Sequence, residues 1–124
     1  MSSIINFKEK FKLFSDLWSP KIIGQFDNYQ IKAAKMLGEF IWHSHDDADE
    51  CFIVIEGELT ILLRNYSVDK VVLKAGESFI VPKGIEHKTV AEQEVHVLFI
   101  EKVGTINTGD QSTASQTVTQ EEWI

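Results

Sequence analysis

The amino-acid sequence predicts an all-β fold, a sandwich or barrel, preceded by one short N-terminal helix. Short apolar segments are separated by turn signals about every eight to twelve residues, which is typical of such folds. Helical periodicity is confined to the start of the chain, and 124 residues with 44% hydrophobic content suffice for one domain core. We expect a single domain over residues 1–124, with a helix at about 6–18, a barrel at about 20–103 and a polar tail at 104–124.

The helix is predicted by aromatic residues at helical spacing with lysines between them: Phe7, Phe11, Phe14 and Trp18. Asn6 and Glu9 fit a capping pair at its start. Pro20 is expected to end it.

The rest of the chain predicts about nine short strands. They lie in the segments KIIGQF, YQIKAAKML, EFIWHSH, ECFIVIEGELTILLR, VVLKA, SFIVPKGIEHKTV and EQEVHVLFIEK. The longest apolar segment divides at Glu56-Gly57 into two strands joined by a tight turn. The Ser/Thr/Gln-rich tail could be disordered, or Trp123 and Ile124 could dock back onto the domain.

The strand at 50–55 should be covered on both sides. Side chains alternate across a strand, so the even residues of 50–54 share one face and the odd residues of 51–55 share the other. Both faces are apolar apart from Glu50. One face would line the barrel interior, and the N-terminal helix, a second sheet or a partner subunit would cover the other. We expect a homodimer, because an exposed face of this kind would be an unusual apolar patch.

Charge and composition exclude several classes of function. Residues 1–37 carry six lysines and three acids, whereas the remainder carries sixteen acids and six bases. An acidic main body is unsuited to nucleic acid, and the lysines at the start are expected to form a solvated helix face. No apolar segment approaches the roughly 20 residues of a membrane span, and the charged start is unlike a signal peptide. One cysteine, Cys51, permits no disulfide within the chain. We therefore expect a cytoplasmic protein that binds neither nucleic acid nor membranes.

Three histidines and one glutamate are candidate metal ligands. His43 and His45 would share one strand face, roughly 6–7 Å apart along the chain, which lets them converge on one ion. Glu50 begins the next strand and could reach the same point, and His87 follows a Pro-Gly turn. Imidazoles with one carboxylate suit a divalent transition metal: Fe, Mn, Ni, Zn, Co or Cu. A lone strand histidine is usually structural, so the prediction depends on the combined pattern.

The combined pattern resembles the two motifs of the cupin superfamily. The first, His-x-His-x4-Glu-x6-Gly, is matched by His43, His45, Glu50 and Gly57. The second, Gly-x5-Pro-x-Gly-x2-His, is matched by Gly76, Pro82, Gly84 and His87. Gly38 precedes His43 with four intervening residues where the family usually has five. Ala91 replaces the asparagine that follows the second motif, which puts one supporting contact in doubt.

This resemblance implies a double-stranded β-helix, the jelly-roll cupin barrel. It also implies that His43, His45, Glu50 and His87 bind one metal ion inside the barrel. The chain is similar to small single-domain bacterial and archaeal cupins, which are often loosely labelled mannose-6-phosphate-isomerase-like. We do not transfer that activity, because a sugar phosphate needs a basic clamp. The basic candidates are not expected to point inward: Arg64, Lys83 and Lys88.

The resulting functional hypothesis is a small metal-binding cupin that binds or transforms a small molecule. If it is an enzyme, a metal-dependent dioxygenase or isomerase is expected. The alternatives are a non-catalytic ligand-binding or metal-sensing module and a relic barrel with an empty site. Glu50 is either a plain ligand or a carboxylate that leaves the ion and acts as a catalytic base.

Other polar residues have weaker functional interpretations. Asp46, Asp47 and Asp49 are expected to form a solvated loop, with a second cation site as the alternative. His96 is expected to be a core or surface histidine, with an acid or base in the cavity as the alternative. Cys51 should face away from Glu50. The side on which Phe40 lies is left open.

Overall fold

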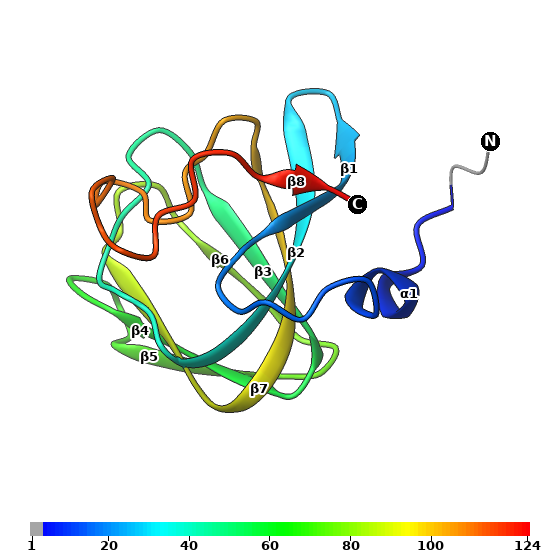
Figure 1. Cartoon of the computed structure of the whole chain (residues 1–124). Helices are drawn as coiled ribbons and strands as arrows, with labels where there is room; N and C mark the ends of the chain where they lie inside the picture. The colour runs from blue at the N-terminus through cyan, green and yellow to red at the C-terminus, as the bar shows by residue number, and fades with distance from the viewer. Residues whose placement is uncertain (1–3) are drawn as a thin grey trace.

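The structure is a computed structural model that describes residues 4–124 as a rolled β-structure with one helix (Figure 1). Its elements are α1 (Phe7–Phe11), β1 (Lys21–Phe26), β2 (Tyr29–Glu39), β3 (Glu50–Glu56), β4 (Glu58–Leu63), β5 (Lys70–Lys74), β6 (Ser78–Val81), β7 (His87–Lys102) and β8 (Glu122–Trp123). The prediction of an all-β jelly roll is confirmed.

The long strand β7 organises the sheet. It pairs antiparallel with β4 through its first residues, with β3 through its later residues and with β2 along its other edge. The hydrogen-bonded order is β5-β4-β7-β2-β1-β8, with β3 and β6 attached beside β7, and the order does not close into a complete barrel. The segments HKTV and EQEVHVLFIEK, which the sequence predicts as two separate strands, form one bent strand, β7.

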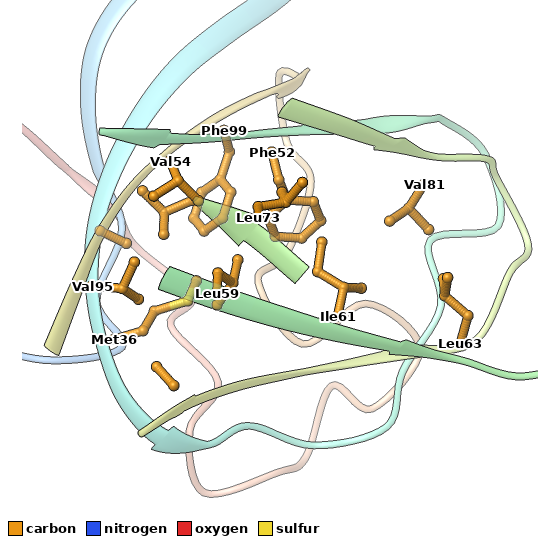
Figure 2. Packing of buried hydrophobic residues seen from close by; sticks show 13 residues of the cluster. Met36, Phe52, Val54, Leu59, Ile61, Leu63, Leu73, Val81, Val95 and Phe99 are labelled. Carbon is orange, nitrogen blue, oxygen red and sulfur yellow. The ribbon is translucent and has the colours of Figure 1, made fainter. Parts of the chain in front are cut away.

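The interior lies between the part of the sheet that contains β3 and the part that contains β4 (Figure 2). Phe52 and Val54 of β3 point into it from one side, and Leu59 and Ile61 of β4 from the other, all nearly or fully buried. Alternation along β3 agrees with the prediction, because Glu50 shares the inward face and Cys51 is only half-buried.

The helix is shorter than predicted and ends at Phe11 rather than near residue 18. Its start agrees with the prediction, since the Glu9 N–H donates to Asn6 Oδ1 at 3.0 Å. The aromatic residues predicted to lie along one helix face pack on different surfaces. Phe11 packs on the outer side of the sheet, whereas the Trp18 ring stacks on Phe40 with centroids 4.9 Å apart.

The outer apolar face of β3 is partly covered within the chain, and its residues Ile53 and Ile55 are half-buried. Ile53 and Ile55 belong to a cluster that includes Phe11 and Ile124, the C-terminal residue. Of the covers considered, the N-terminal segment therefore supplies part, and the homodimer stays a prediction.

The C-terminal tail is docked rather than extended. Residues 104–121 form successive turns, and β8 then pairs parallel with β1. The Ile124 N–H donates to Ile22 O at 3.1 Å, and Lys10 Nζ donates to Ile124 O at 2.7 Å. Between residues 4 and 124, no helix is long and apolar enough to cross a membrane.

Candidate metal centre

The four residues singled out from the sequence meet at one buried point. One potential ligand atom from each of His43, His45, Glu50 and His87 lies within 4.8 Å of those of the others. All four side chains are buried. Glu50 is the first residue of β3 and His87 the first residue of β7, so the ends of two strands position two members of the cluster.

The His43–His45 segment reaches the cluster without forming the predicted strand. Residues 40–49 are largely irregular, and they are tied to β7 by an isolated bridge at His43 and by the Phe40 N–H, which donates to Thr89 O at 2.9 Å. The His43 N–H donates to His87 O at 3.0 Å, and the His87 N–H donates to His43 O at 2.9 Å. This bridge brings the two ring centroids to 4.3 Å.

Hydrogen bonds to carbonyl oxygens orient two of the rings. His43 Nδ1 lies 2.9 Å from Ile41 O, and His87 Nδ1 lies 2.9 Å from Ile85 O. A carbonyl oxygen only accepts, so each Nδ1 carries a proton, and Nε2 is the ring nitrogen left to face the cluster. Supporting bonds of this kind fix metal-binding imidazoles in proteins.

The pKa shifts of His43 and Glu50 favour metal binding, whereas that of His45 opposes it. Burial, reinforced by the charge of His87, lowers the pKa of His43 to about 4, so this ring is neutral at pH 7. Burial opposes ionisation of Glu50, but the charge of His45 and the hydrogen bond from His87 outweigh it and hold the pKa of Glu50 well below its usual value. Burial also opposes the charge on His45, yet Glu50 raises its pKa. Neutral imidazoles and an ionised carboxylate are the forms that bind a metal.

One atom of the cluster needs a further partner. His45 Nε2 lies 3.3 Å from Glu50 Oε1, within range of a charge interaction. It is nevertheless buried without a hydrogen-bond partner of suitable geometry among the described residues. A buried polar nitrogen without a partner is costly. A metal ion would satisfy it, and three nitrogens with one carboxylate suit a divalent transition metal. The cluster could therefore hold a metal ion.

A small cavity of about 30 Å³ borders His43 and Glu50. Its walls are mainly apolar, with Met36, Phe52 and Phe99 among them. Phe40 also lies here, edge-on to His43 with ring centroids 5.3 Å apart, which settles the position left open by the sequence. The free space is about that of two water molecules.

A buried charge network beside the cavity was missed in the sequence. Lys32 Nζ lies 2.9 Å from Glu101 Oε1 and 2.6 Å from Glu121 Oε1. Glu101 lines the same cavity as Glu50, and the two carboxyl groups influence each other's pKa. Burial and the nearby charge of Glu50 raise the pKa of Glu101 well above its usual value, and Glu101 Oε2 is buried without a hydrogen-bond partner among the described residues.

Strand alternation carried a signal for this network. Lys32 has the same parity as buried Ala34 and Met36, and Glu101 the same parity as buried Val97 and Phe99. A charged residue at an inward position suggests a buried partner. Its partner could not be identified from the sequence, because Glu101 and Glu121 lie far along the chain.

The remaining candidates lie outside the cluster. Asp46, Asp47 and Asp49 are exposed, and Asp49 Oδ1 accepts a hydrogen bond from the Lys83 N–H at 2.9 Å. The His96 ring stacks on Phe11, with centroids 4.8 Å apart, on the outer side of the sheet. This placement agrees with the structural interpretation of His96.

The basic residues considered for a phosphate clamp do not line the cavity. Arg64 stacks over the Trp42 ring, 3.8 Å from its centroid. Lys83 is exposed, and Lys88 forms an ion pair with Glu39.

Comparisons with known proteins agree with this geometry. The family model described as the cupin domain matches residues 36–101, more than half of the chain. Uncharacterized protein YdbB of Bacillus subtilis (strain 168) is 40% identical over 82 residues, which cover 66% of this chain and 65% of YdbB. The match therefore spans slightly less than two thirds of that relative.

Solved structures are similar over most of the chain. A cupin-2 domain containing protein from Shewanella frigidimarina NCIMB 400 is 46% identical, with a TM-score of 0.75 and coverage of 80% of this chain and 94% of that one. Hydroquinone 1,2-dioxygenase from Sphingomonas sp. TTNP3 is 16% identical, with a TM-score of 0.67 and coverage of 98% of this chain and 90% of that one. At this low identity, the second similarity concerns the fold alone.

Proposed function

Because the chain belongs to the cupin family, we propose that it binds one divalent transition metal ion through His43, His45, Glu50 and His87 and acts on or binds a small molecule there. The observation that carries this proposal is the meeting of four buried ligand atoms within 4.8 Å. When bound, such an ion supplies Lewis-acid chemistry or, if it is redox-active, electron-transfer chemistry.

The chain's own residues would prepare the site for that ion. The carbonyl oxygens of Ile41 and Ile85 hold the Nδ1 protons of His43 and His87. The apolar walls of the cavity exclude bulk water, which strengthens charge interactions inside it. Glu50 is either a permanent ligand or a base that accepts a proton from a bound molecule.

The choice between catalysis and binding depends on the bound molecule. A dioxygenase or isomerase would need space for a substrate, whereas the cavity of about 30 Å³ holds only a few atoms. The second candidate is a non-catalytic ligand-binding or metal-sensing cupin, and the small volume favours its metal-sensing form, which needs no space for an organic molecule. The fold similarity to a hydroquinone dioxygenase supports including oxygen-dependent turnover among the tests.

Metal binding is tested first, by elemental analysis of protein from its native host and by calorimetric titration of metal-free protein. We expect one ion per chain. His87→Ala and Glu50→Gln should each lower the affinity strongly, while His96→Ala, a histidine outside the cluster, should not. Absence of binding, or equal loss in His96→Ala, would contradict the proposal.

The small molecule is tested second. Compounds released on denaturing the native protein should be identified by mass spectrometry and incubated with metal-loaded protein, with and without oxygen. Turnover would support an enzyme. Saturable binding without turnover would support the binding or sensing module.

A further inference from the structure

The C-terminal tail contacts the segment that carries two of the candidate ligands. The Ser44 N–H donates to Asp110 Oδ1 at 3.0 Å, and the Asp110 N–H donates to Ser44 O at 3.0 Å. Ser44 stands between His43 and His45. Both polar groups of its backbone are therefore held by one residue that lies 66 positions later in the chain.

The neighbouring glycine allows this close approach. Gly109 has a φ of +55°, and a Cβ atom on it would lie 2.2 Å from Ser44 O and 3.2 Å from His43 Cδ2. Any larger residue would push the tail away from the histidine segment. The contact thus depends on a glycine at this position.

The tail is itself fixed in place. Thr108 is fully buried, and its hydroxyl lies 2.6 Å from the hydroxyl of Thr117. The Val118 N–H donates to Asn107 Oδ1 at 2.8 Å. Farther along, Glu121 forms its ion pair with buried Lys32. Residues 108–110 are therefore presented to Ser44 by a segment anchored on both sides.

The histidine segment has few other supports. Residues 43–45 lie outside the strand ladders. Within residues 4–124, their backbone hydrogen bonds to the rest of the domain, apart from those with Asp110, are the bridge between His43 and His87 and the bond from the Gly84 N–H to His45 O at 2.8 Å. Those bonds attach to the second motif. The support at Ser44 comes from the tail. The tail lies beyond residue 101, where the match to the cupin family model ends.

We propose that Asp110 and Gly109 are positioning residues of the metal centre, which hold the backbone at Ser44 so that the His43 and His45 rings converge with Glu50 and His87. This inference depends on the proposed metal binding. Neither residue belongs to the predicted ligand set, and they act through backbone hydrogen bonds and close packing.

Two substitutions at Asp110 distinguish the effect of its hydrogen bond on metal affinity from the effect of its charge. Asp110→Ala removes the acceptor for the Ser44 N–H, whereas Asp110→Asn removes the charge and keeps the Oδ1 acceptor. Asp47→Ala is the matched charge control, because its exposed carboxylate also lies close enough to influence His45.

The test is the affinity of metal-free protein for Co²⁺, measured by competition with a chelating indicator. Changes in groups that orient metal ligands typically cost about 10-fold to 100-fold in affinity. We expect a loss of about tenfold for Asp110→Ala and Gly109→Ala, and an affinity close to wild type for Asp110→Asn and Asp47→Ala. Equal affinity of Asp110→Ala and wild type would overturn the proposal. An equal loss in Asp110→Asn would do so too, because it would assign the effect to charge.

A second measurement reports on the positioning without metal. Exchange of the Ser44 amide hydrogen, followed by NMR in metal-free protein, should be faster in Asp110→Ala and restored in Asp110→Asn. An unchanged exchange rate in Asp110→Ala would overturn the positioning role. Failure of the wild-type protein to bind metal would overturn the proposed function, and with it the metal role of these residues. Normal metal binding by Asp110→Ala would overturn the positioning role alone.

Discussion

Lys32 Nζ lies 2.9 Å from Glu101 Oε1 in the interior of the domain, and Glu101 in turn lines the same cavity as Glu50 of the candidate metal centre. A charge network therefore runs from Glu121 of the tail, through Lys32, to the cluster. Burial of such charges is costly, and each depends on its partners.

Removing the lysine should destabilise the protein. Lys32→Met leaves the largely buried Glu121 carboxylate without its cation, and breaking a buried ion pair typically costs about 3 to 5 kcal/mol. The free energy of unfolding in urea at neutral pH measures this loss. Lys21→Met is the matched control, because Lys21 is also buried but its partners Asp16 and Glu122 are exposed. If both variants lost the same free energy of unfolding, burial of the partners of Lys32 would not add to stability, which would contradict the prediction.

The contribution of His43 to the stability of the metal-free protein should fall as the pH falls below about 6.5. The pKa of His43 is lowered from 6.5 to about 4 by burial and by the charge of His87. Between these values the unfolded chain binds more protons at this residue than the folded protein does. The contribution of His43 to stability is therefore complete above pH 6.5 and is lost as the pH falls toward 4.

Urea unfolding at several pH values in this range measures that effect. His43→Gln has no imidazole to titrate, so its stability should decline less steeply with acid than that of wild type. Parallel declines in the two proteins would show that another group is responsible.

Metal ions should stabilise the folded chain. At a free metal concentration of 100 times the dissociation constant, binding contributes about 2.7 kcal/mol. For a domain of this size, that corresponds to a rise in melting temperature of roughly 10 °C. Thermal unfolding with and without Co²⁺ measures the rise, which should be absent in His87→Ala. A rise of the same size in that variant would place the ion elsewhere.

The inner core should be more sensitive than the surface to the same substitution. Ile61 is fully buried in the interior, so Ile61→Ala should cost about 2 to 5 kcal/mol through lost burial and the cavity left behind. Ile80→Ala is the control, because Ile80 is 56% exposed and a surface change of this type usually costs about 0.5 kcal/mol or less. Chemical denaturation of both variants tests the difference, and similar costs would contradict the assigned inward face of β4.

Local periodicity predicted some parts of the molecule well. Alternation along β3 predicted that Glu50 faces inward and Cys51 does not, because strand geometry follows directly from neighbouring residues. The meeting of His43 and His45 with Glu50 and His87 was also expected, although an isolated bridge, rather than a strand, supplies the geometry.

Other parts depend on contacts between distant residues, which composition does not reveal. The aromatic stripe predicted a helix to about residue 18, but Trp18 stacks on Phe40 instead of continuing the helix that ends at Phe11. The polar tail gave no local sign that Asp110 would meet Ser44. The tail docks at Ser44 through a contact between residues that lie far apart in the sequence.

The position of β7 in the sheet sets an order for biosynthesis. Every strand that pairs with it, β2, β3 and β4, precedes it along the chain, so a ribosome delivers these strands before the one that joins them. Asp110 and Glu121 emerge later still. A nascent chain would therefore present an incomplete candidate metal centre until residues 109–121 have left the ribosome, because Asp110 and Glu121 complete its support.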